Sequence, residues 1–334
     1  MTPDERDRLA PLLDAAGLPP GPVTVRRIGE GHSNRTYLVE RGGGRAVLRR
    51  PPPPPVPAGG HDVLREAALL RALDGADLPV PRVLASAAAG EVLDDPLYVM
   101  THVDGPVVTT RTPPPLDTPA RRAEAGVSLV TALARLHAVD VRSGPLAALG
   151  RPDGFNRRHV ERIARLVTGP DGAPPDAFAA LEAWLLDHVP PEAGAAVVHH
   201  DYRLGNVVLA PDAPGRVAAV LDWELATLGD PLWDLAYLVA SWPDASGPAT
   251  PTQALSTAQL EPGWPRRDEV AGIYTAAAGH AVGDLSWYLA AVQWKLAVLY
   301  EYQRRKVGGP GGDPYYADPG HVEAFLAAAL AATR

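Results

Sequence analysis

Residues 197–238 constrain this chain most, because short apolar runs alternate there with acidic, histidine and asparagine side chains. The runs at 197–198, 207–209 and 217–221 are β-branched or aliphatic, and polar or turn-forming residues bound each of them. Short runs of this kind predict buried strands. Residues 210–215 are rich in proline and also contain aspartate and glycine, so the last two strands are expected to form a hairpin.

Polar side chains are expected at the mouths of these strands. Asp201 and Asn206 lie on the loop that enters the hairpin, and Asp222 lies on the loop that leaves it. Carboxylate and amide oxygens that converge at one end of a sheet suit a divalent cation such as Mg²⁺. Phosphoryl transfer needs a proton acceptor, then an oxygen ligand for Mg²⁺, then a carboxylate from a following loop. The three residues occur in that order.

The sequence HHDYRLGN, followed by LDWE, resembles the catalytic and metal loops of the aminoglycoside phosphotransferase-like kinases. The usual form in that family is H-G-D-x-x-x-x-N and then a D-x-D/E step. The resemblance implies that Asp201 is the catalytic base and that Asn206 and Asp222 hold Mg²⁺. It also implies that His199 anchors the loop, and Arg203, inside the same motif, is a further catalytic candidate.

Two other functional classes stay open. His200 stands where the family usually has glycine, and Arg49 stands where related kinases have lysine, which allows a nucleotide-binding pseudokinase that acts as a sensor or scaffold. A metal-dependent hydrolase is the other alternative for His199, His200, Asp201 and Asp222. Adjacent histidines point apart on a strand, however, and no HxH or HExxH motif occurs elsewhere. Asp230 and Asp234 are expected to be structural, near the start of a helix that passes through residues 233–239.

The N-terminal part predicts strands at 23–28, 36–40 and 45–50, with a glycine-rich turn between the first two. Strand, glycine-rich turn and strand suit a nucleotide lid, because backbone N–H groups can approach phosphates where there is no Cβ. The turn is not a Walker loop, since no GK[ST] follows it. Its sequence resembles the G-x-S-N-x-T-Y lid of the same kinases, and this resemblance implies phosphate contacts from Ser33 and Asn34.

A phosphate-binding arginine is expected on the third strand. Related kinases place a lysine there, but this chain has no lysine before Lys295. The matching position is Arg49, as in the phosphotransferase domain fused to some acyl-CoA dehydrogenases, and arginine binds phosphate through two nitrogens at once. Arg50 competes for this role. Glu66, in a helix expected at 62–73, is the expected ion-pair partner of Arg49.

Residues 97–103 resemble the hinge of such kinases. Met100 is expected behind the adenine, and the backbone groups of Thr101 and Val103 are expected to contact its edge. The predicted fold class is α+β, a bilobal protein-kinase-like fold with a small antiparallel-sheet lobe and a mainly helical lobe. The expected division is residues 1–103 for the nucleotide-binding lobe and 104–334 for the catalytic and substrate-binding lobe.

Helices dominate the expected second lobe. They are predicted at 118–139, 154–167, 175–188, 268–279, 284–306 and 321–332, and another is predicted at the N-terminus over 4–16. Residues 241–265, with proline, glycine, serine and threonine throughout, are expected to form a long loop. The aromatic residues within 284–306 are expected to belong to the core rather than to a pocket.

Composition limits the partners. The 334 residues can form two packed lobes, and the net charge of −8 argues against nucleic acid as a partner. The chain has no cysteine, no long apolar run and no signal-peptide core, so a cytoplasmic protein without a membrane partner is expected, as a monomer or homodimer. The expected reaction is ATP- and Mg²⁺-dependent phosphorylation of a small-molecule hydroxyl group. A hydroxylated metabolite such as a hydroxyacyl thioester is the first candidate acceptor, and an aminoglycoside is the second.

Overall fold

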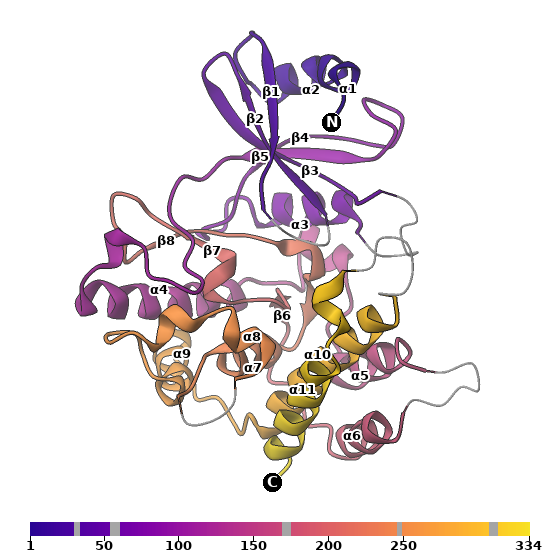
Figure 1. The fold of residues 1–334 in the computed structure, drawn as a ribbon, viewed down its shortest axis with the longest axis vertical. Helices are drawn as coiled ribbons and strands as arrows, with labels where there is room; N and C mark the ends of the chain where they lie inside the picture. The colour runs from indigo at the N-terminus through magenta and orange to yellow at the C-terminus, as the bar shows by residue number, and fades with distance from the viewer. Residues whose placement is uncertain (30–33, 54–60, 169–174, 246–248, 307–312) are drawn as a thin grey trace.

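The computed structural model describes residues 1–29, 34–53, 61–168, 175–245, 249–306 and 313–334. Figure 1 shows a sheet-rich part at the N-terminal end and a larger helical part below it. Helix α3 lies beneath the sheet, on the side of the helical part. The expected α+β class, with a small antiparallel-sheet part and a mainly helical part, is confirmed.

The N-terminal sheet has five antiparallel strands in the order β1-β2-β3-β5-β4. Alternating side chains give it two buried faces: Leu9, the helix α2 and the strands enclose one apolar cluster, while α3 packs under the other face. The strands are β1 (Val23–Arg27), β2 (Arg35–Arg41), β3 (Gly44–Arg50), β4 (Val83–Ala87) and β5 (Leu97–Thr101).

The hydrophobic core does not divide at residue 103. Helix α3 (Val63–Leu73) and β5 contribute Leu70, Tyr98 and Met100 to the same apolar cluster as the helical part. Helix α3 begins at a side-chain cap, in which Asp62 accepts from the Arg65 N–H at 3.0 Å. The division into separate functional lobes at 103/104 stays a prediction.

Two short ladders carry the segment that the sequence analysis singled out. Strands β7 (Val207–Leu209) and β8 (Val217–Val220) form the expected hairpin. The strand expected at 197–198 is β6 (Ala196–Val198), and it pairs with β9 (Thr227–Gly229). The sequence analysis did not predict β9. Together the ladders bring the loop after β6 and the loop after β8 to the same edge of the helical part.

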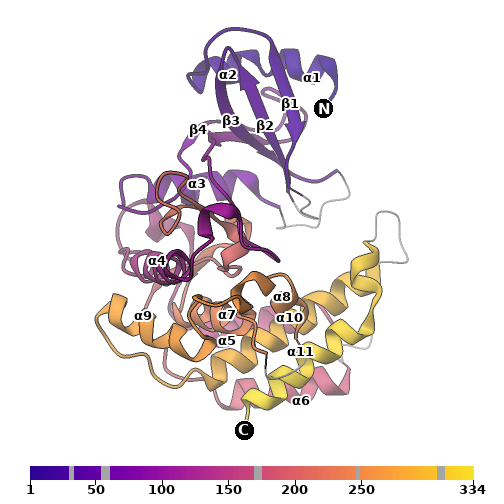
Figure 2. The same ribbon diagram turned by 60° about the vertical axis from the view of Figure 1, so that its left-hand side comes forward.

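The helical part packs around α7 and α10. Helices α10 and α11 lie side by side (Figures 1 and 2), and α10 also contacts α5, α6 and α7. Gly105 joins the two parts of the chain at φ 147°, where a Cβ would overlap the carbonyl group of Leu209. The helices are α4 (Pro119–His137), α5 (Phe155–Ala164), α6 (Asp176–Asp187), α7 (Leu232–Ser241), α8 (Pro251–Ala254), α9 (Val270–Ala278), α10 (Ser286–Lys306) and α11 (Pro319–Ala332).

Two expectations about local structure were wrong. The single helix expected over 4–16 is two helices, α1 (Pro3–Arg8) and α2 (Ala10–Ala15), because Pro11 has no N–H and its ring crowds the preceding turn. Residues 241–265 are not one long loop, since α8 and a 3-10 turn at Thr257–Leu260 lie within them. A capping box at α8, in which Thr250 and Gln253 exchange hydrogen bonds, explains that helix.

Candidate active site

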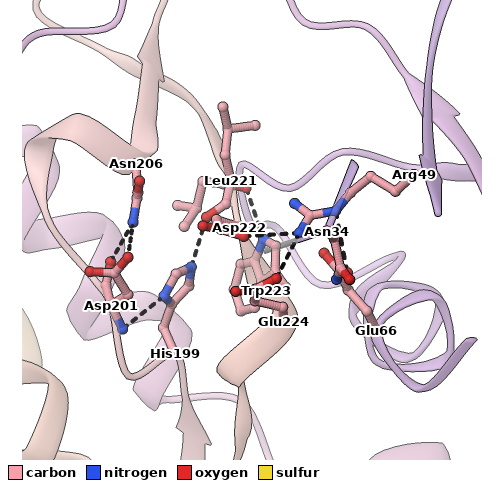
Figure 3. A network of polar contacts seen from close by, with 11 residues as sticks. Asn34, Arg49, Glu66, His199, Asp201, Asn206, Leu221, Asp222, Trp223 and Glu224 are labelled. Carbon is pink, nitrogen blue, oxygen red and sulfur yellow. Dashed lines mark hydrogen bonds and ion pairs between the residues drawn. The ribbon is translucent and has the colours of Figure 1, made fainter. Parts of the chain in front are cut away.

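His199 connects the two loops of the site. Its Nε2–H donates to the Leu221 carbonyl oxygen at 2.8 Å, and its Nδ1 accepts the Asp201 backbone N–H at 3.3 Å (Figure 3). The imidazole is therefore neutral, with its proton on Nε2. The Leu221 N–H donates in turn to the Asn206 carbonyl oxygen at 2.8 Å. These bonds hold Asp201, Asn206 and Asp222 in one place.

Three donor side chains surround the Asp201 carboxylate. Its Oδ2 accepts from Asn206 Nδ2 at 2.7 Å, and its Oδ1 accepts from the Tyr237 hydroxyl group and lies 3.4 Å from Arg203 Nε. Burial and the charge of Asp201 raise the pKa of Tyr237, so its hydroxyl group stays protonated and donates. The Asp201 side chain remains 23% exposed, which leaves it open to a substrate.

Asp234 binds the backbone of the loop that carries Asp201. Its buried carboxylate accepts the backbone N–H groups of His199 and His200 at 2.6 and 2.7 Å. Asp230 accepts the Leu232 N–H at 3.0 Å at the start of α7 and also accepts from Tyr288 and Asn156. The expectation that Asp230 and Asp234 are structural is confirmed.

His200 has a backbone conformation that glycine adopts without strain. Its φ is 68°, in the left-handed region, which costs an L-residue about 1–2 kcal/mol. The ring stacks on His159, with centroids 4.6 Å apart, and on Phe155 at 5.8 Å. Burial lowers the pKa of His200, so the stacked ring is neutral. His200 therefore belongs to the core beneath Asp201, which removes it from the alternative of a metal-dependent hydrolase.

Arg49 is held by three carboxylates. Its guanidinium group lies 3.4 Å from Glu66, 3.0 Å from Asp222 and 3.3 Å from Glu224 (Figure 3). Burial opposes the charge on Arg49, but the carboxylates outweigh it and raise the pKa. Burial raises the pKa of Glu66, and Arg49 opposes that shift. The expected pair between Arg49 and Glu66 is present, and Glu224 is a partner that the sequence analysis missed.

The two adjacent arginines of β3 face opposite sides of the sheet, as alternate strand residues do. Arg50 pairs with Glu5 at 2.7 Å and with Asp95 at 2.6 Å, on the side of α1. Arg49, on the other side, therefore occupies the position expected of the phosphate-binding residue. Arg203 is also partly buried, and Asp201 outweighs the effect of that burial and raises the pKa of Arg203.

The remaining nucleotide candidates lie around Arg49 and β5. Asn34 Nδ2 is 3.5 Å from Glu66 Oε2, and Asn34 Oδ1 is buried without a partner among the described residues. Met100 is buried on β5. The Thr101 N–H donates to the Arg82 carbonyl oxygen at 2.9 Å, so this N–H group is not available to a ligand. Val103 is half-buried just after β5, and Ser33 lies outside the described residues.

The oxygens expected to bind a metal are free on one side. Asn206 donates its Nδ2 to Asp201, and among the described residues its Oδ1 accepts from no group. Asp222 uses Oδ1 for Arg49 and has no such partner at Oδ2. Uncharged and carboxylate oxygens are the donors that Mg²⁺ prefers. Within the described ranges no cluster of three His, Cys, Asp or Glu side chains suits a metal, so phosphate oxygens would have to complete the ligand set.

Comparisons with known proteins agree with this geometry. A sequence model of the phosphotransferase enzyme family (APH) matches residues 24–270. The chain is 32% identical over 305 residues to acyl-CoA dehydrogenase family member 11 of Gallus gallus, an alignment that covers 88% of this chain and 38% of the chicken protein. The chain therefore spans about two fifths of that relative's length.

Solved structures show the same fold. A protein of Ralstonia eutropha titled "putative aminoglycoside phosphotransferase" is 28% identical, with a TM-score of 0.78 and coverage of 97% of this chain and 98% of that one. The aminoglycoside phosphotransferase APH(4)-Ia, solved with AMP-PNP and hygromycin B, is 19% identical with a TM-score of 0.60, and the match covers 93% and 95% of the two chains.

The fold and the matched motifs define a kinase-type phosphotransferase. The chain belongs to the phosphotransferase enzyme family, in the branch related to the domain fused to acyl-CoA dehydrogenases. Among the described residues, none of the helices combines the length and apolar character that crossing a membrane requires.

Proposed function

We propose that this protein transfers the γ-phosphoryl group of ATP to a hydroxyl group of a small molecule. The observation that carries the proposal is the Asp201 carboxylate, which three donors orient while it stays open to solvent. A base must lie within hydrogen-bond reach of the proton that it removes and must be held in direction. Membership of the phosphotransferase family supports the reaction class.

In this proposal Asp201 orients the acceptor hydroxyl group and takes its proton. A bond forms between the acceptor oxygen and the γ-phosphorus, and the bond from that phosphorus to the bridging oxygen of ADP breaks. Tyr237 and Asn206 keep the carboxylate aimed at the acceptor. Arg203 adds positive charge beside the reacting groups. Because the transition state is loose, positioning and charge neutralisation do most of the work.

Asn206 and Asp222 would hold Mg²⁺, and their uncommitted oxygens fit that role. When bound, the ion neutralises charge on the β- and γ-phosphates. Arg49 would grip the phosphates, which requires it to release Asp222 and Glu224 and to keep Glu66. Met100 and the backbone of Thr101 and Val103 would contact the adenine, and Ser33 and Asn34 would contact the phosphates. The complex of APH(4)-Ia with AMP-PNP supports a nucleotide in this fold.

Charge near Asp201 favours a hydroxylated metabolite that carries an acidic group, either as a free acid or elsewhere in a thioester, as the acceptor. Arg203 lies beside Asp201, and the positive charge of Lys295 acts on the same carboxylate. The positive charges of Arg203 and of the buried Lys295 disfavour a polycationic aminoglycoside beside Asp201, although Lys295 makes no direct contact with the acceptor. The acyl-CoA dehydrogenase relatives point the same way. The aminoglycoside names of the structural neighbours make antibiotic phosphorylation the second candidate.

The test is release of ADP from Mg·ATP in the presence of hydroxyacyl thioesters, free hydroxy acids and aminoglycosides. We expect acceptor-dependent ADP release with at least one hydroxyacyl compound and little with aminoglycosides. Phosphorylated acceptor must appear in equal amount, which phosphorus NMR would measure. Tight Mg·ATP binding without turnover on any hydroxyl compound would contradict the proposal and would favour a nucleotide-binding scaffold.

A further inference from the structure

Lys295 is a buried cation directly beneath the catalytic loop. It lies on α10 with only 3% of its surface exposed, and its neighbours in sequence, Trp294 and Leu296, are buried apolar residues. Burying an ammonium group is unfavourable unless the protein uses its charge or its donors. One of only two lysines in the chain therefore occupies a position that packing alone would give to leucine or methionine.

The ammonium group contacts two parts of the site. Lys295 Nζ donates to the His200 carbonyl oxygen at 3.1 Å, which among the described residues is its one hydrogen-bond acceptor. It also lies 5.4 Å from the centroid of the Tyr237 ring, within the range of a cation–π contact. His200 directly precedes Asp201, and the Tyr237 hydroxyl group donates to Asp201 Oδ1. Both contacts therefore lead to the same carboxylate.

The backbone conformation of His200 makes this support necessary. A residue other than glycine at φ 68° tends to relax unless its surroundings hold it there. Asp234 holds the N–H groups of His199 and His200 from one side. Lys295 holds the carbonyl group of His200 from the other. The loop is thus clamped between an anion on α7 and a cation on α10.

We propose that Lys295 is a positioning residue for phosphoryl transfer, which sets the direction of the Asp201 carboxylate through His200 and Tyr237. The inference rests on the proposed function, in which Asp201 is the base. It assigns no contact between Lys295 and substrate. Loss of the ammonium group would leave the nucleotide site intact, because Arg49, Asn206 and Asp222 make no hydrogen bond or ion pair with Lys295 among the described residues.

The charge of Lys295 can be lost within an accessible pH range. Burial lowers the pKa of Lys295 to about 8, and Arg162 adds to that effect, while Asp201 and Asp234 oppose it. A neutral amine keeps a donor for His200 but loses its attraction to the Tyr237 ring. We therefore expect turnover to fall as the pH rises through about 8. The polar groups that face Lys295 from the packed elements are His159 and Arg162 of α5, His200 and Asp201 of the catalytic loop, and Asp234 and Tyr237 of α7.

A direct measurement exploits the two lysines. Biosynthetic labelling with ¹³Cε-lysine gives two resonances, and the Lys306→Arg variant assigns the exposed one. We expect the Lys295 resonance to titrate near pH 8 in the unliganded protein. Titration at the ordinary value of about 10.4 would overturn the expected decline of turnover above pH 8. This readout needs neither acceptor nor turnover.

The kinetic arm compares Lys295→Met and Lys295→Arg by ADP release from Mg·ATP, with water or an identified hydroxyl compound as the acceptor. Lys295→Met should lower kcat about 10- to 100-fold at pH 7 through misplacement of Asp201, with unchanged calorimetric affinity for Mg·ATP. Lys295→Arg keeps a permanent charge, so the decline of kcat above pH 8 should disappear. Lys306→Met, which removes a surface ammonium group 3.9 Å from the Tyr302 ring centroid, is the matched control and should change nothing.

The effect of Lys295→Met on folding can be distinguished from its effect on the position of Asp201 by measuring stability and turnover separately. Burial lowers the pKa of Lys295 to about 8, which means that the charged side chain costs the folded protein stability at pH 7. Lys295→Met removes that cost, so it should not lower the melting temperature at pH 7. A rate and pH profile unaffected by Lys295→Met would overturn this inference alone. No Mg·ATP binding and no ADP release by the folded wild-type protein would overturn the proposed function and this inference with it.

Discussion

Replacing Asp201 with asparagine is expected to lower the rate of phosphoryl transfer by about 10²- to 10⁴-fold, the usual contribution of a general base. The affinity for Mg·ATP should stay nearly unchanged, because Asp201 contacts neither Arg49 nor Asp222, and its bond with Asn206 uses Nδ2 and not the Oδ1 that would hold Mg²⁺. The measurements are steady-state ADP release and calorimetric titration with Mg·ATP.

The control for Asp201→Asn is Asp212→Asn, which removes an exposed carboxylate from the turn between β7 and β8. It should change neither quantity. Asparagine at position 201 has one acceptor oxygen for the donors of Tyr237 and Asn206, so a stability loss of about 1–3 kcal/mol is expected and must be measured by denaturation. Equal loss of nucleotide binding and transfer would count against Asp201 as the base.

Replacing Arg49 with methionine is expected to destabilise the fold by about 3–5 kcal/mol, because the Glu66 side chain, 2% exposed, loses its cation. The double variant Arg49→Met/Glu66→Met should recover most of this stability without recovering Mg·ATP affinity. Urea denaturation and calorimetry measure the two effects separately. Full stability together with unchanged nucleotide affinity in Arg49→Met would contradict the role assigned to Arg49.

The pH dependence of Arg49→Met has a definite sign. Burial raises the pKa of Glu66, and removal of Arg49 takes away the group that opposes this shift. The folded variant then binds a proton that the unfolded chain has lost, so its stability should fall as the pH rises above the ordinary value of about 4.3. Arg50→Met is the matched control on the same strand. Its partners Glu5 and Asp95 are about a quarter exposed, so it should cost less and leave nucleotide binding unchanged.

Local patterns predicted much of the site. The apolar runs on either side of a proline-rich turn gave the hairpin of β7 and β8, and the spacing of Asp201, Asn206 and Asp222 put these residues at its mouth. The pairing of Arg49 with Glu66 was predicted from the resemblance to related kinases, on a strand and a helix that the local patterns located. These features depend on residues close in sequence or on one well-defined arrangement of elements.

Other features depend on contacts that the sequence does not encode locally. Tyr237 looks like a core residue of an apolar helix, and only the packing of α7 under the catalytic loop brings its hydroxyl group to Asp201. Lys295 lies within an aromatic stripe, which reads as core. Strand β9 has three residues and is defined by its distant partner β6. By contrast, the sequence TPTQ at 250–253 is a capping-box signal that could have located α8.

The measurement that tests the account most directly is calorimetric titration of the protein with ATP, with and without Mg²⁺, repeated with Asp222→Ala. Asp222→Gly should accompany it, because φ at this position is 66° and glycine adopts that conformation without strain. We predict Mg²⁺-dependent binding by the wild-type protein and its loss in both variants. Failure of the folded wild-type protein to bind Mg·ATP, or Mg²⁺-dependent binding that survives in both variants, would contradict the proposed site.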